Sequence, residues 1–492
     1  MPSVSTLYQR FLKMKSHRQV LENTWRECYE FALPQREGLL SGVSSQVDRL
    51  FDGTAPDCVD QLAASIFSEL TPPWCKWFDL RAGTEVDKDD EETIKSLQNI
   101  SEILKNHLNQ STFSVEMHQC FLDLVTVGTA CLLFEESRLG EKTAFHFTAV
   151  PLSEIYVDEG YSGRLDTTYR YCQMPLSTLM QRFDRAKVVD EKVLGDENPA
   201  DIQIPIIECV VPRLSGGYDY VAFIEKDSNH LFSPADQFLL KEGFFETSPF
   251  ITFRWLKAPG EIYGRSPVMK ALPDIKTTNK VVELILKNAS IAVTGIWQAE
   301  DDGVLNPANI RLVPGTIIPK AVGSKGLTPL QPAGDFDVSQ LILEDLRARI
   351  RHALLTDKLG LVQNNQMTAT EVLERSAEMV RILGATYGRL QSELLTPLIE
   401  RALNILRRRG EIPDLYLDGR VVSITYQSPI ASLQTQKEAS NALTFVRSLI
   451  DMKVDALQMI DVLGFAKWLA ARLNVPLSLI KDTFANLPEE AK

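Results

Sequence analysis

Apolar residues near the start of the chain recur at helical spacing. Large side chains in residues 5–33 fall three or four positions apart, namely Leu7, Phe11, Met14, Arg18, Leu21 and Trp25. A second helix is predicted over residues 56–70, because proline stands in its first turn and Thr71-Pro72-Pro73 ends the pattern. A third periodic segment runs from Ile94 to Leu108. The chain is therefore predicted to begin with helices.

An acidic stretch precedes the third helix. Residues Glu85 to Glu92 hold six carboxylates and one lysine. Paired carboxylates can hold Mg²⁺ or carry out acid–base chemistry, but acidic side chains also complement the dipole at a helix N-terminus. Because an apolar-periodic segment follows directly, we interpret the stretch as a solvated helix start.

The apolar pattern changes between residues 121 and 270. Short apolar or alternating runs are separated there by Gly, Pro, Asp and Asn, which is the spacing of strands and turns. The runs are Ala130–Glu135, Phe145–Val150, Ile204–Val211, Tyr218–Glu225 and Phe250–Trp255. A β-rich region that follows helices makes the predicted fold class α+β.

Two further helices are predicted to flank a compact insertion. Ser266 is an N-cap followed by proline, so a helix is expected over 266–293, with Pro273 kinking or restarting it. Residues 294–336 are dense in Gly and Pro and are predicted to form a small α/β module, mainly strand. A return helix over 337–355 follows, with apolar residues at steps of four. The order predicts two paired helices that carry a module at their far end.

A polar loop, residues 356–367, leads into a capping box formed by Thr368 and Glu371. The helix that starts there is predicted to reach Arg409 and end at Gly410, with a kink at Pro397. It would be roughly 60 Å long, which suits an elongated subunit. One strand is predicted at residues 421–427 and a small helical tail at 433–490.

Composition and charge limit the function. The chain has 492 residues, 44% of them apolar and 24% charged, so it is expected to fold into two or more domains. Its formal net charge is −13, and an acidic surface repels phosphate. Any interaction with DNA must therefore be local or must exploit this repulsion.

The cysteines and the hydropathy indicate an intracellular protein. Seven cysteines occur, an odd number, and none forms a CxxC pair. We predict reduced thiols, most of them small core residues. The N-terminus lacks the pattern of a signal peptide. The most apolar longer segment, Val281 to Val293, is broken by Glu283 and Lys287 and is too short to cross a bilayer. No membrane association is expected.

Catalytic signatures were not found. The chain has no phosphate-binding loop, HExxH, GxSxG or EF-hand pattern, and its six histidines are dispersed without cysteines at zinc-ligand spacing. We predict no enzyme activity, no catalytic residue, no metal and no cofactor. The alternative is an intracellular nucleic-acid enzyme, a metal-dependent nuclease with a dispersed carboxylate site. An adaptor or another structural protein is a third possibility.

Basic residues cluster near the end of the return helix. They are Arg347, Arg349, Arg351, His352 and Lys358. Arg347 and Arg351 share one helix face. One interpretation is that they complement the helix dipole and pair with Glu344 and Asp345. The other is a basic ring that contacts DNA phosphates transiently.

Six short motifs occur in order along the chain. They are Phe51-Asp52-Gly53-Thr54-Ala55-Pro56, Leu70-Thr71-Pro72-Pro73-Trp74 with Trp77-Phe78, Val127-Gly128-Thr129-Ala130, Tyr263-Gly264-Arg265-Ser266-Pro267, Met367-Thr368-Ala369-Thr370-Glu371-Val372 and Tyr426-Gln427-Ser428-Pro429. Together they resemble the podovirus-type head-to-tail connector family, the portal proteins of T7-like phages, over nearly the whole chain. Two features depart from that pattern. Ser266 stands where glycine is often expected, and the tail after residue 433 is short.

The resemblance implies an elongated portal subunit with an α-helical stem, an α/β wing and clip, and a helical crown. By this resemblance the wing comprises residues 1–265, which are helical and then β-rich, together with the long kinked helix and strand of 368–432. The stem consists of the helix 266–293 and the return helix 337–355, and the clip, 294–336, lies between them. The tunnel loop is 356–367 and the crown is 433–492. About twelve such subunits would form a closed ring.

The resemblance also implies sites and partners. The tunnel loop would act through Asp357, Lys358, Gly360, Asn364 and Asn365, and the stem would line the channel with Lys280, Glu283, Lys287, Arg347 and Arg351. The ring would sit at the portal vertex of the virion capsid after assembly in the host cytoplasm. Its partners would be double-stranded DNA in packaging, retention and ejection, the terminase large subunit, a head–tail adaptor, and the capsid and scaffolding proteins.

Overall fold

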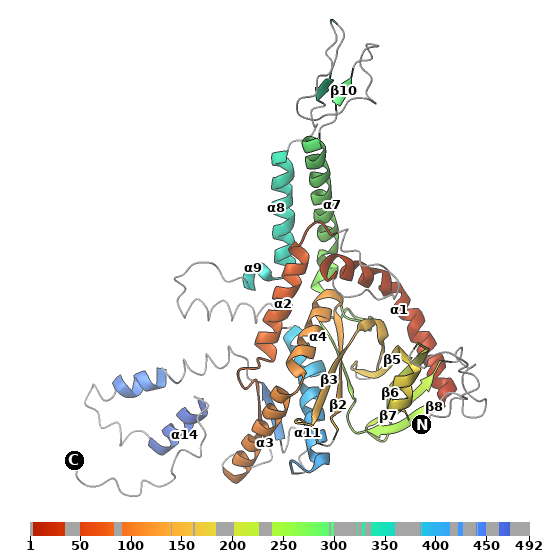
Figure 1. Ribbon diagram of the computed structural model, residues 1–492. Helices are drawn as coiled ribbons and strands as arrows, with labels where there is room; N and C mark the ends of the chain where they lie inside the picture. Colours follow the sequence, from red (N-terminus) through yellow and green to blue (C-terminus); the bar gives the residue numbers. More distant parts are fainter. Residues whose placement is uncertain are drawn as a thin grey trace.

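The structure is a computed structural model that describes residues 3–34, 50–82, 91–138, 140–160, 163–183, 201–225, 239–294, 297–299, 322, 327–329, 336–359, 384, 386–413, 422–426, 439, 441–448 and 462–472. A body of packed helices and sheets carries a projecting pair of helices (Figure 1). The α+β prediction is confirmed at this level, because helices and strands both build the body.

Four helices open the chain: α1 (Val4–Ala32), α2 (Thr54–Leu70), α3 (Glu91–Gln110) and α4 (Phe113–Val127). The first three were predicted, with ends shifted by a few residues. The fourth was not, because residues 121–127 were placed in the β-rich region. Every residue of α4 from Cys120 to Val127 is buried. A helix that is buried on all sides has no polar face, so its sequence shows no amphipathic period.

The body contains two larger antiparallel sheets, with strand orders β4-β5-β6-β7-β8 and β3-β2-β9. Five of their strands match predicted runs: β2 (Thr129–Glu136), β3 (Phe145–Val150), β6 (Gln203–Pro212), β7 (Tyr218–Ile224) and β9 (Phe250–Arg254). Three were not predicted: β4 (Ile155–Glu159), β5 (Leu165–Pro175) and β8 (Leu239–Phe245). A third pairing, of β1 (Phe78–Ala82) with β12 (Val422–Tyr426), confirms the strand predicted at 421–427.

Helix α1 covers one face of the five-stranded sheet. Leu7, Phe11 and Met14 pack in one apolar cluster with residues of β4 to β7, among them Tyr169 and Cys209. Tyr169 stands opposite Cys209 across the β5–β6 pair, so both side chains emerge on the same face. The apolar period of the first helix therefore marks the surface that it buries.

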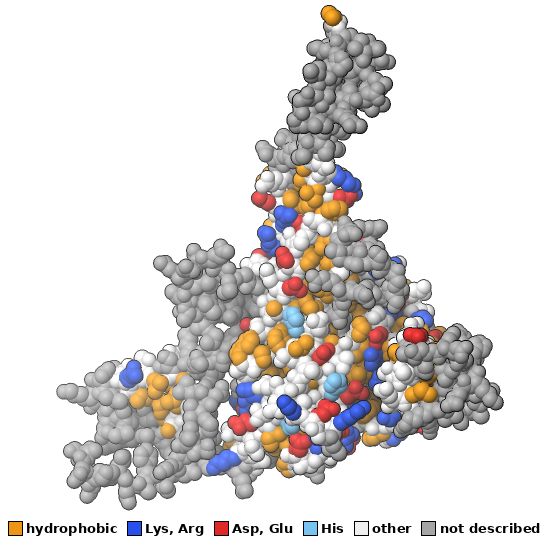
Figure 2. All heavy atoms as spheres, in the orientation of Figure 1, with side chains coloured by type: hydrophobic (Ala, Val, Ile, Leu, Met, Phe, Trp, Pro, Cys, Tyr) orange, Lys and Arg blue, Asp and Glu red, His pale blue; other side chains and the backbone are white. Residues whose placement is uncertain are grey.

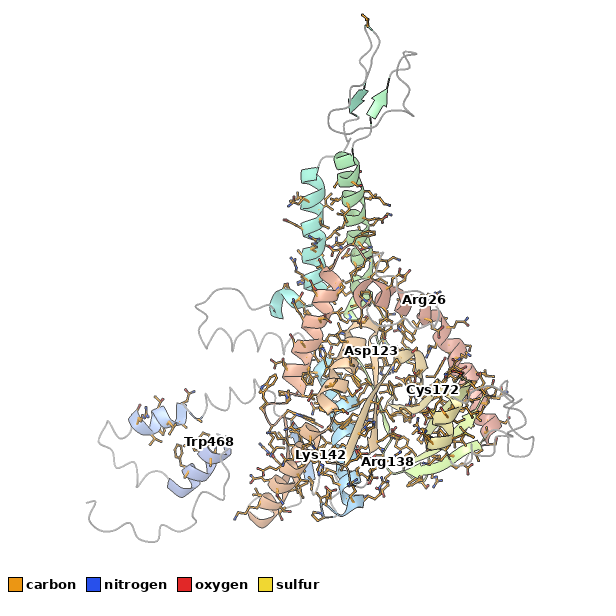
Figure 3. The ribbon with its side chains drawn as sticks, viewed as in Figure 1. Arg26, Asp123, Arg138, Lys142, Cys172 and Trp468 are labelled. Carbon is orange, nitrogen blue, oxygen red and sulfur yellow. The ribbon has the colours of Figure 1, made fainter. Side chains whose placement is uncertain are left out.

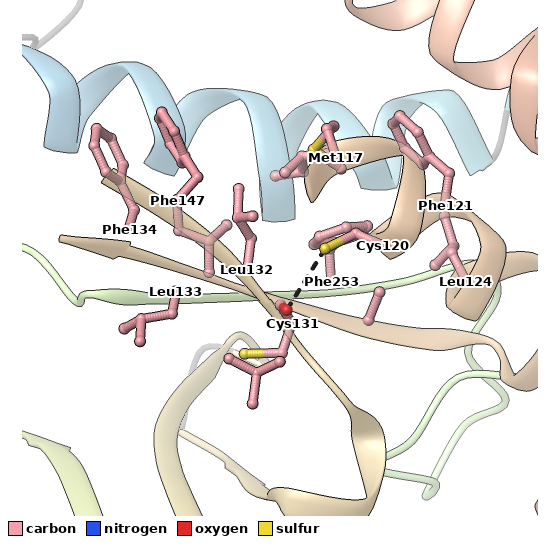
Figure 4. Close-up of a cluster of buried hydrophobic side chains, with 14 of the residues drawn as sticks. Met117, Cys120, Phe121, Leu124, Cys131, Leu132, Leu133, Phe134, Phe147 and Phe253 are labelled. Carbon is pink, nitrogen blue, oxygen red and sulfur yellow. Dashed lines mark hydrogen bonds between the residues drawn. The ribbon is translucent and has the colours of Figure 1, made fainter. Parts of the chain in front are cut away.

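The main core lies between α4 and the three-stranded sheet (Figure 4). Leu132 and Phe134 of β2 share one face because side chains alternate along a strand, and Cys131 and Leu133 point to the other face. Deeper in the body, the Tyr29 hydroxyl of α1 donates a hydrogen bond of 2.9 Å to the carboxylate of Asp123 on α4. Asp123 is labelled in Figure 3. All seven cysteines are free thiols and six are buried, as predicted.

The projecting pair consists of α7 (Pro267–Thr294) and α8 (Phe336–Ala353), which pack on each other. The short antiparallel strands β10 (Trp297–Ala299) and β11 (Leu327–Pro329) lie at its tip (Figure 1). The predicted helix–module–helix order therefore holds for the described residues. Pro273 does not restart the helix, because α7 continues through it. Proline removes one backbone donor here, close to the helix N-terminus.

The remaining elements are shorter. They are 3-10 helix η2 (Leu152–Glu154), α5 (Leu176–Arg182), α9 (Thr356–Leu359), the π-helical turn η6 (Gln391–Leu395), α11 (Thr396–Arg409) and α14 (Val462–Arg472). Helix α11 ends at Gly410, whose φ of 73° is left-handed, with Arg407, Arg408 and Arg409 in its last turn, as predicted. The π turn precedes Pro397, whose ring conflicts with the carbonyl four residues earlier. The predicted distortion at this proline therefore takes the form of a π turn.

Candidate functional site

The projecting pair is tied to the body by a short segment before α2. The backbone N–H groups of Phe51 and Asp52 donate to Oδ1 of Asn279 on α7, at 2.7 and 3.2 Å. Oδ2 of Asp52 accepts from Nε and Nη2 of Arg347 on α8, at 2.9 and 2.5 Å. One segment of the first motif thus holds both projecting helices at their base.

The environment of Asp52 stabilises its charged form. Its side chain is 4% exposed, and Oδ1 accepts from the Thr54 backbone N–H at 3.0 Å at the start of α2. Burial by itself raises the pKa of Asp52, but the hydrogen bonds from Thr54 and Arg347 outweigh it and lower this pKa below its ordinary value. Asp52 is therefore held as a carboxylate.

The third and fourth motifs meet at the start of α7. Gly128 has a φ of 80°, and a Cβ added to Gly264 would lie 2.0 Å from the Gly128 carbonyl oxygen. The Gly264 N–H donates to Oγ1 of Thr129 at 2.8 Å. Two backbone segments that are distant in sequence touch here, and only glycine permits the contact.

Ser266 has two roles at this point. Its Oγ accepts from the Met269 backbone N–H at 2.9 Å, which confirms the predicted N-cap of α7. The same hydroxyl donates to the carbonyl of Thr126 at the end of α4, at 2.8 Å. Serine therefore both starts the projecting helix and fastens it to α4, which glycine would not do.

Three of the predicted channel residues form an exposed triad on α7. Glu283 accepts from Lys280 at 2.8 Å and from Lys287 at 2.5 Å. The hydrogen bonds from Lys280 and then Lys287 lower the pKa of Glu283 to about 2. The triad therefore carries one net positive charge. Figure 2 shows charged side chains alternating with apolar ones along the projecting pair.

The arginines of α8 have partners other than those predicted. Arg347 pairs with Asp52, and Arg349 pairs with Asp274 of α7 at 3.0 Å. The interpretation that these two arginines pair with Glu344 and Asp345 is therefore wrong. Helix α8 packs against α7 and against residues 50–53, and these segments supply the carboxylates. Arg351 is exposed and has no ion-pair partner among the residues that the structure describes.

The predicted tunnel loop begins as a helix. Asp357 and Lys358 lie in α9, and Oδ2 of Asp357 is 3.0 Å from Nδ1 of His352. Leu355, at a φ of 61°, separates α8 from α9, and Thr356 donates to Sγ of Cys58 on α2 at 3.2 Å. Residues Thr356–Leu359, the first four of the predicted tunnel loop, therefore form a helix and not a loop. Other predicted residues lie outside the described part of the chain: Gly360, Asn364, Asn365, Thr368 and Glu371.

A buried ion network was missed in the sequence. Arg254 of β9 is fully buried and binds Glu393 of the π turn through Nη2 at 2.6 Å and Nε at 3.2 Å. Its Nη1 also binds Glu159, which in turn binds Lys257. The sequence did contain a signal for this network, a single arginine inside the apolar run Phe250–Trp255. A charge in such a run is expected to be buried, and a buried charge requires a partner.

Neither a metal-binding cluster nor a membrane-spanning helix occurs among the described residues. Within these ranges, no group of three or more His, Cys, Asp or Glu side chains is placed to hold a metal ion. None of the described helices is long and apolar enough to cross a membrane.

Comparison with known proteins gives consistent matches. The family model described as bacteriophage head to tail connecting protein matches residues 4–480. The probable portal protein of Bordetella phage BPP-1 is 23% identical over 96% of this chain and 88% of the relative. The portal protein of Salmonella phage epsilon15 is 23% identical over 93% of this chain and 85% of the relative. The portal protein of Enterobacteria phage T3 is 23% identical over 65% of this chain and 58% of the relative.

Proposed function

Because this chain belongs to the family of bacteriophage head to tail connecting proteins, we propose that α7 and α8 line the channel of a ring through which double-stranded DNA passes. The chain is a phage portal protein, a structural component of the virion at the capsid vertex that serves genome packaging. The family implies an oligomeric ring with capsid-side and tail-side partners.

The observation that carries this proposal is the shape and surface of the projecting pair. The two helices leave the body together, and the short antiparallel strands β10 and β11 lie at their tip (Figure 1). Their surface has exposed charges, and it has exposed apolar side chains at Leu284, Leu286, Leu341 and Ile342. Apolar groups on a projecting element require a partner, and in a closed ring each subunit supplies it to the next.

The finer assignment follows the family resemblance. We assign the stem to 266–293 and 337–355, the clip to 294–336, the tunnel loop to 356–367 and the crown to 433–492, with the wing made of 1–265 and 368–432. The terminase large subunit would dock at the clip, and a head–tail adaptor would follow it there. Capsid and scaffolding proteins would be further partners during assembly in the host cytoplasm.

The first test is the assembly state. Purified chain, alone and co-expressed with the scaffolding protein of the phage, is examined by negative-stain electron microscopy and by its mass in solution. Rings with a central hole, at about twelve times the 55.2 kDa chain mass, are expected. A monomer in both preparations would contradict the proposal.

The second test concerns the tunnel loop. Deletion of residues 358–366 is expected to leave rings intact while DNA packaging or retention falls in a phage complementation assay. Normal packaging and retention would contradict this role. The nuclease alternative is tested separately, by Mg²⁺-dependent turnover of DNA with the purified protein. No observation in the described residues favours that alternative.

A further inference from the structure

Arg401 on α11 is a buried cation that lacks a carboxylate partner. Its side chain is 5% exposed. Nε donates to the Phe134 carbonyl at 2.6 Å, and Nη1 donates to the Thr247 carbonyl at 2.6 Å and to its hydroxyl at 3.4 Å. These acceptors are all neutral. Nη2 has no hydrogen-bond partner within the described ranges, and a buried charge is costly unless it is paired.

The surroundings of the guanidinium are apolar on two sides. The ring centroids of Phe134 and Phe245 lie 5.7 and 5.3 Å from the guanidinium carbon. Burial, and then the nearby charge of Arg408, lower the pKa of Arg401 to about 9. The charges of Glu135 and Glu136 act in the opposite direction and only partly offset these two effects.

The carboxylates nearby are bound to other arginines. Glu246 pairs with Arg407, and Glu136 pairs with Arg408 and Arg409. Glu135 is 45% exposed and lies 3.7 Å from Arg182. A rearrangement that gave Glu246 or Glu136 to Arg401 would take that carboxylate away from Arg407 or Arg408.

Arg401 lines a hollow of about 370 Å³ between the end of β8 and α11. The wall has three arginines, Arg401, Arg407 and Arg408, and one carboxylate, Glu246. Asn404 stands on the same wall and accepts a hydrogen bond from Arg407 at 3.1 Å. A concave site with an excess of guanidinium groups and apolar flanks suits a planar or tetrahedral oxyanion.

We propose that this hollow binds an oxyanion, a carboxylate or a phosphate group, with Nη2 of Arg401 as its innermost donor. The anion has two possible sources: an acidic side chain or C-terminus of a polypeptide that docks on this face, or free inorganic phosphate. The end of α11 lies on the body far from the β10 tip (Figure 1). A polypeptide partner bound here would therefore act on the part of the subunit remote from that tip.

The test is thermal unfolding of the full chain in sodium phosphate, sodium acetate or sodium chloride at equal ionic strength. Four proteins are compared: the wild type, Arg401→Met, Asn404→Phe and Arg265→Gln. Asn404→Phe fills the hollow and leaves the bonds of Arg401 to Phe134 and Thr247 in place. Arg265 is exposed and pairs with Glu261, so Arg265→Gln controls for the loss of an arginine elsewhere.

Phosphate or acetate is expected to raise the unfolding midpoint of the wild type and Arg265→Gln by about 2 °C or more above chloride. Arg401→Met and Asn404→Phe are expected to show no such rise. A rise with acetate indicates that the hollow accepts a carboxylate group, and a rise with phosphate alone indicates that it selects a tetrahedral anion. Equal midpoints in all three salts, or the same rise in Asn404→Phe as in the wild type, would overturn the proposal. The Asn404→Phe arm decides the question even if Arg401→Met fails to fold.

Discussion

Arg347 on α8 binds Asp52 through two hydrogen bonds, although 295 positions separate the two residues in sequence. The same segment binds Asn279 of α7 through its backbone. The ion pair therefore does more than complement the end of one helix, because it fixes the base of the projecting pair against α2. Because the ion pair lies at the base of α7 and α8, which are proposed to line the channel, it anchors these helices to the body.

Asp52→Asn is predicted to destabilise the chain in a pH-dependent manner. The amide keeps an acceptor for Thr54 but loses the ion pair, a loss of about 1–3 kcal/mol in the free energy of unfolding at neutral pH. Because the pKa of Asp52 is lowered on folding, its contribution is present above the ordinary value of 3.8 and is lost as the pH falls through the lower folded pKa. Urea unfolding should show the wild type and variant converging in acid. A difference that is independent of pH would contradict the charge-based role.

Gly264→Ala is predicted to destabilise the chain by about 3 kcal/mol or more, because the new Cβ meets the backbone of Gly128. Gly388→Ala is the matched control. Gly388 is an exposed helical residue with nothing within 4 Å of an added Cβ, so alanine should stabilise the helix by about 0.5–1 kcal/mol. Chemical denaturation measures both variants. Equal changes in the free energy of unfolding for the two variants would show that the contact between Gly128 and Gly264 tolerates an added Cβ.

Ser266→Ala is predicted to cost about 1–3 kcal/mol. It removes the N-cap of α7 and leaves the buried carbonyl of Thr126 without its donor. Ser16→Ala serves as the control, since exposed Ser16 only donates to the Lys13 carbonyl within α1, and a change within about 0.5 kcal/mol is expected there. A loss no larger than that of the control would indicate that α7 is held by other contacts.

Arg254→Met is predicted to cost about 3–5 kcal/mol, because Glu393, at 8% exposure, would keep a buried charge without its main partner. Adding Glu393→Leu should recover part of this loss, since the double variant buries no charge at that point. The exposed pair of Arg265 and Glu261 provides the comparison, and Arg265→Gln should leave the unfolding midpoint unchanged. Additive losses in the double variant would argue against direct coupling of Arg254 and Glu393.

Arg351→Glu is predicted to alter DNA passage while ring assembly stays normal, because Arg351 is exposed and has no ion-pair partner among the described residues. Arg347→Glu should behave differently, since it places a second carboxylate against Asp52 and lowers stability. Phage complementation reports DNA passage, and mass in solution reports assembly. If Arg351→Glu prevented ring formation, Arg351 would belong to a subunit interface instead of the channel surface.

Much of the element order follows from local patterns. The apolar period of α1 and α2, the alternating run of β3, the apolar run of β7, the Ser266 cap and the Gly410 terminus all depend on residues a few positions apart. The paired helices with a module at the tip follow from the same local signals. Such features can be read from the sequence because the interactions that produce them are short in sequence.

Only the tertiary structure decided which distant residues meet. The second half of α4 was misassigned because residues 120–127 are buried on all sides and show no amphipathic period. The arginines Arg347 and Arg349 of α8 pair with Asp52 and Asp274 instead of the carboxylates beside them in sequence. The contact of Gly128 with Gly264 and the lack of a carboxylate for Arg401 are likewise properties of packed surfaces. Hydrophobic burial sets the positions of the elements without regard to sequence distance, and buried charges then pair with whatever that packing brings within reach.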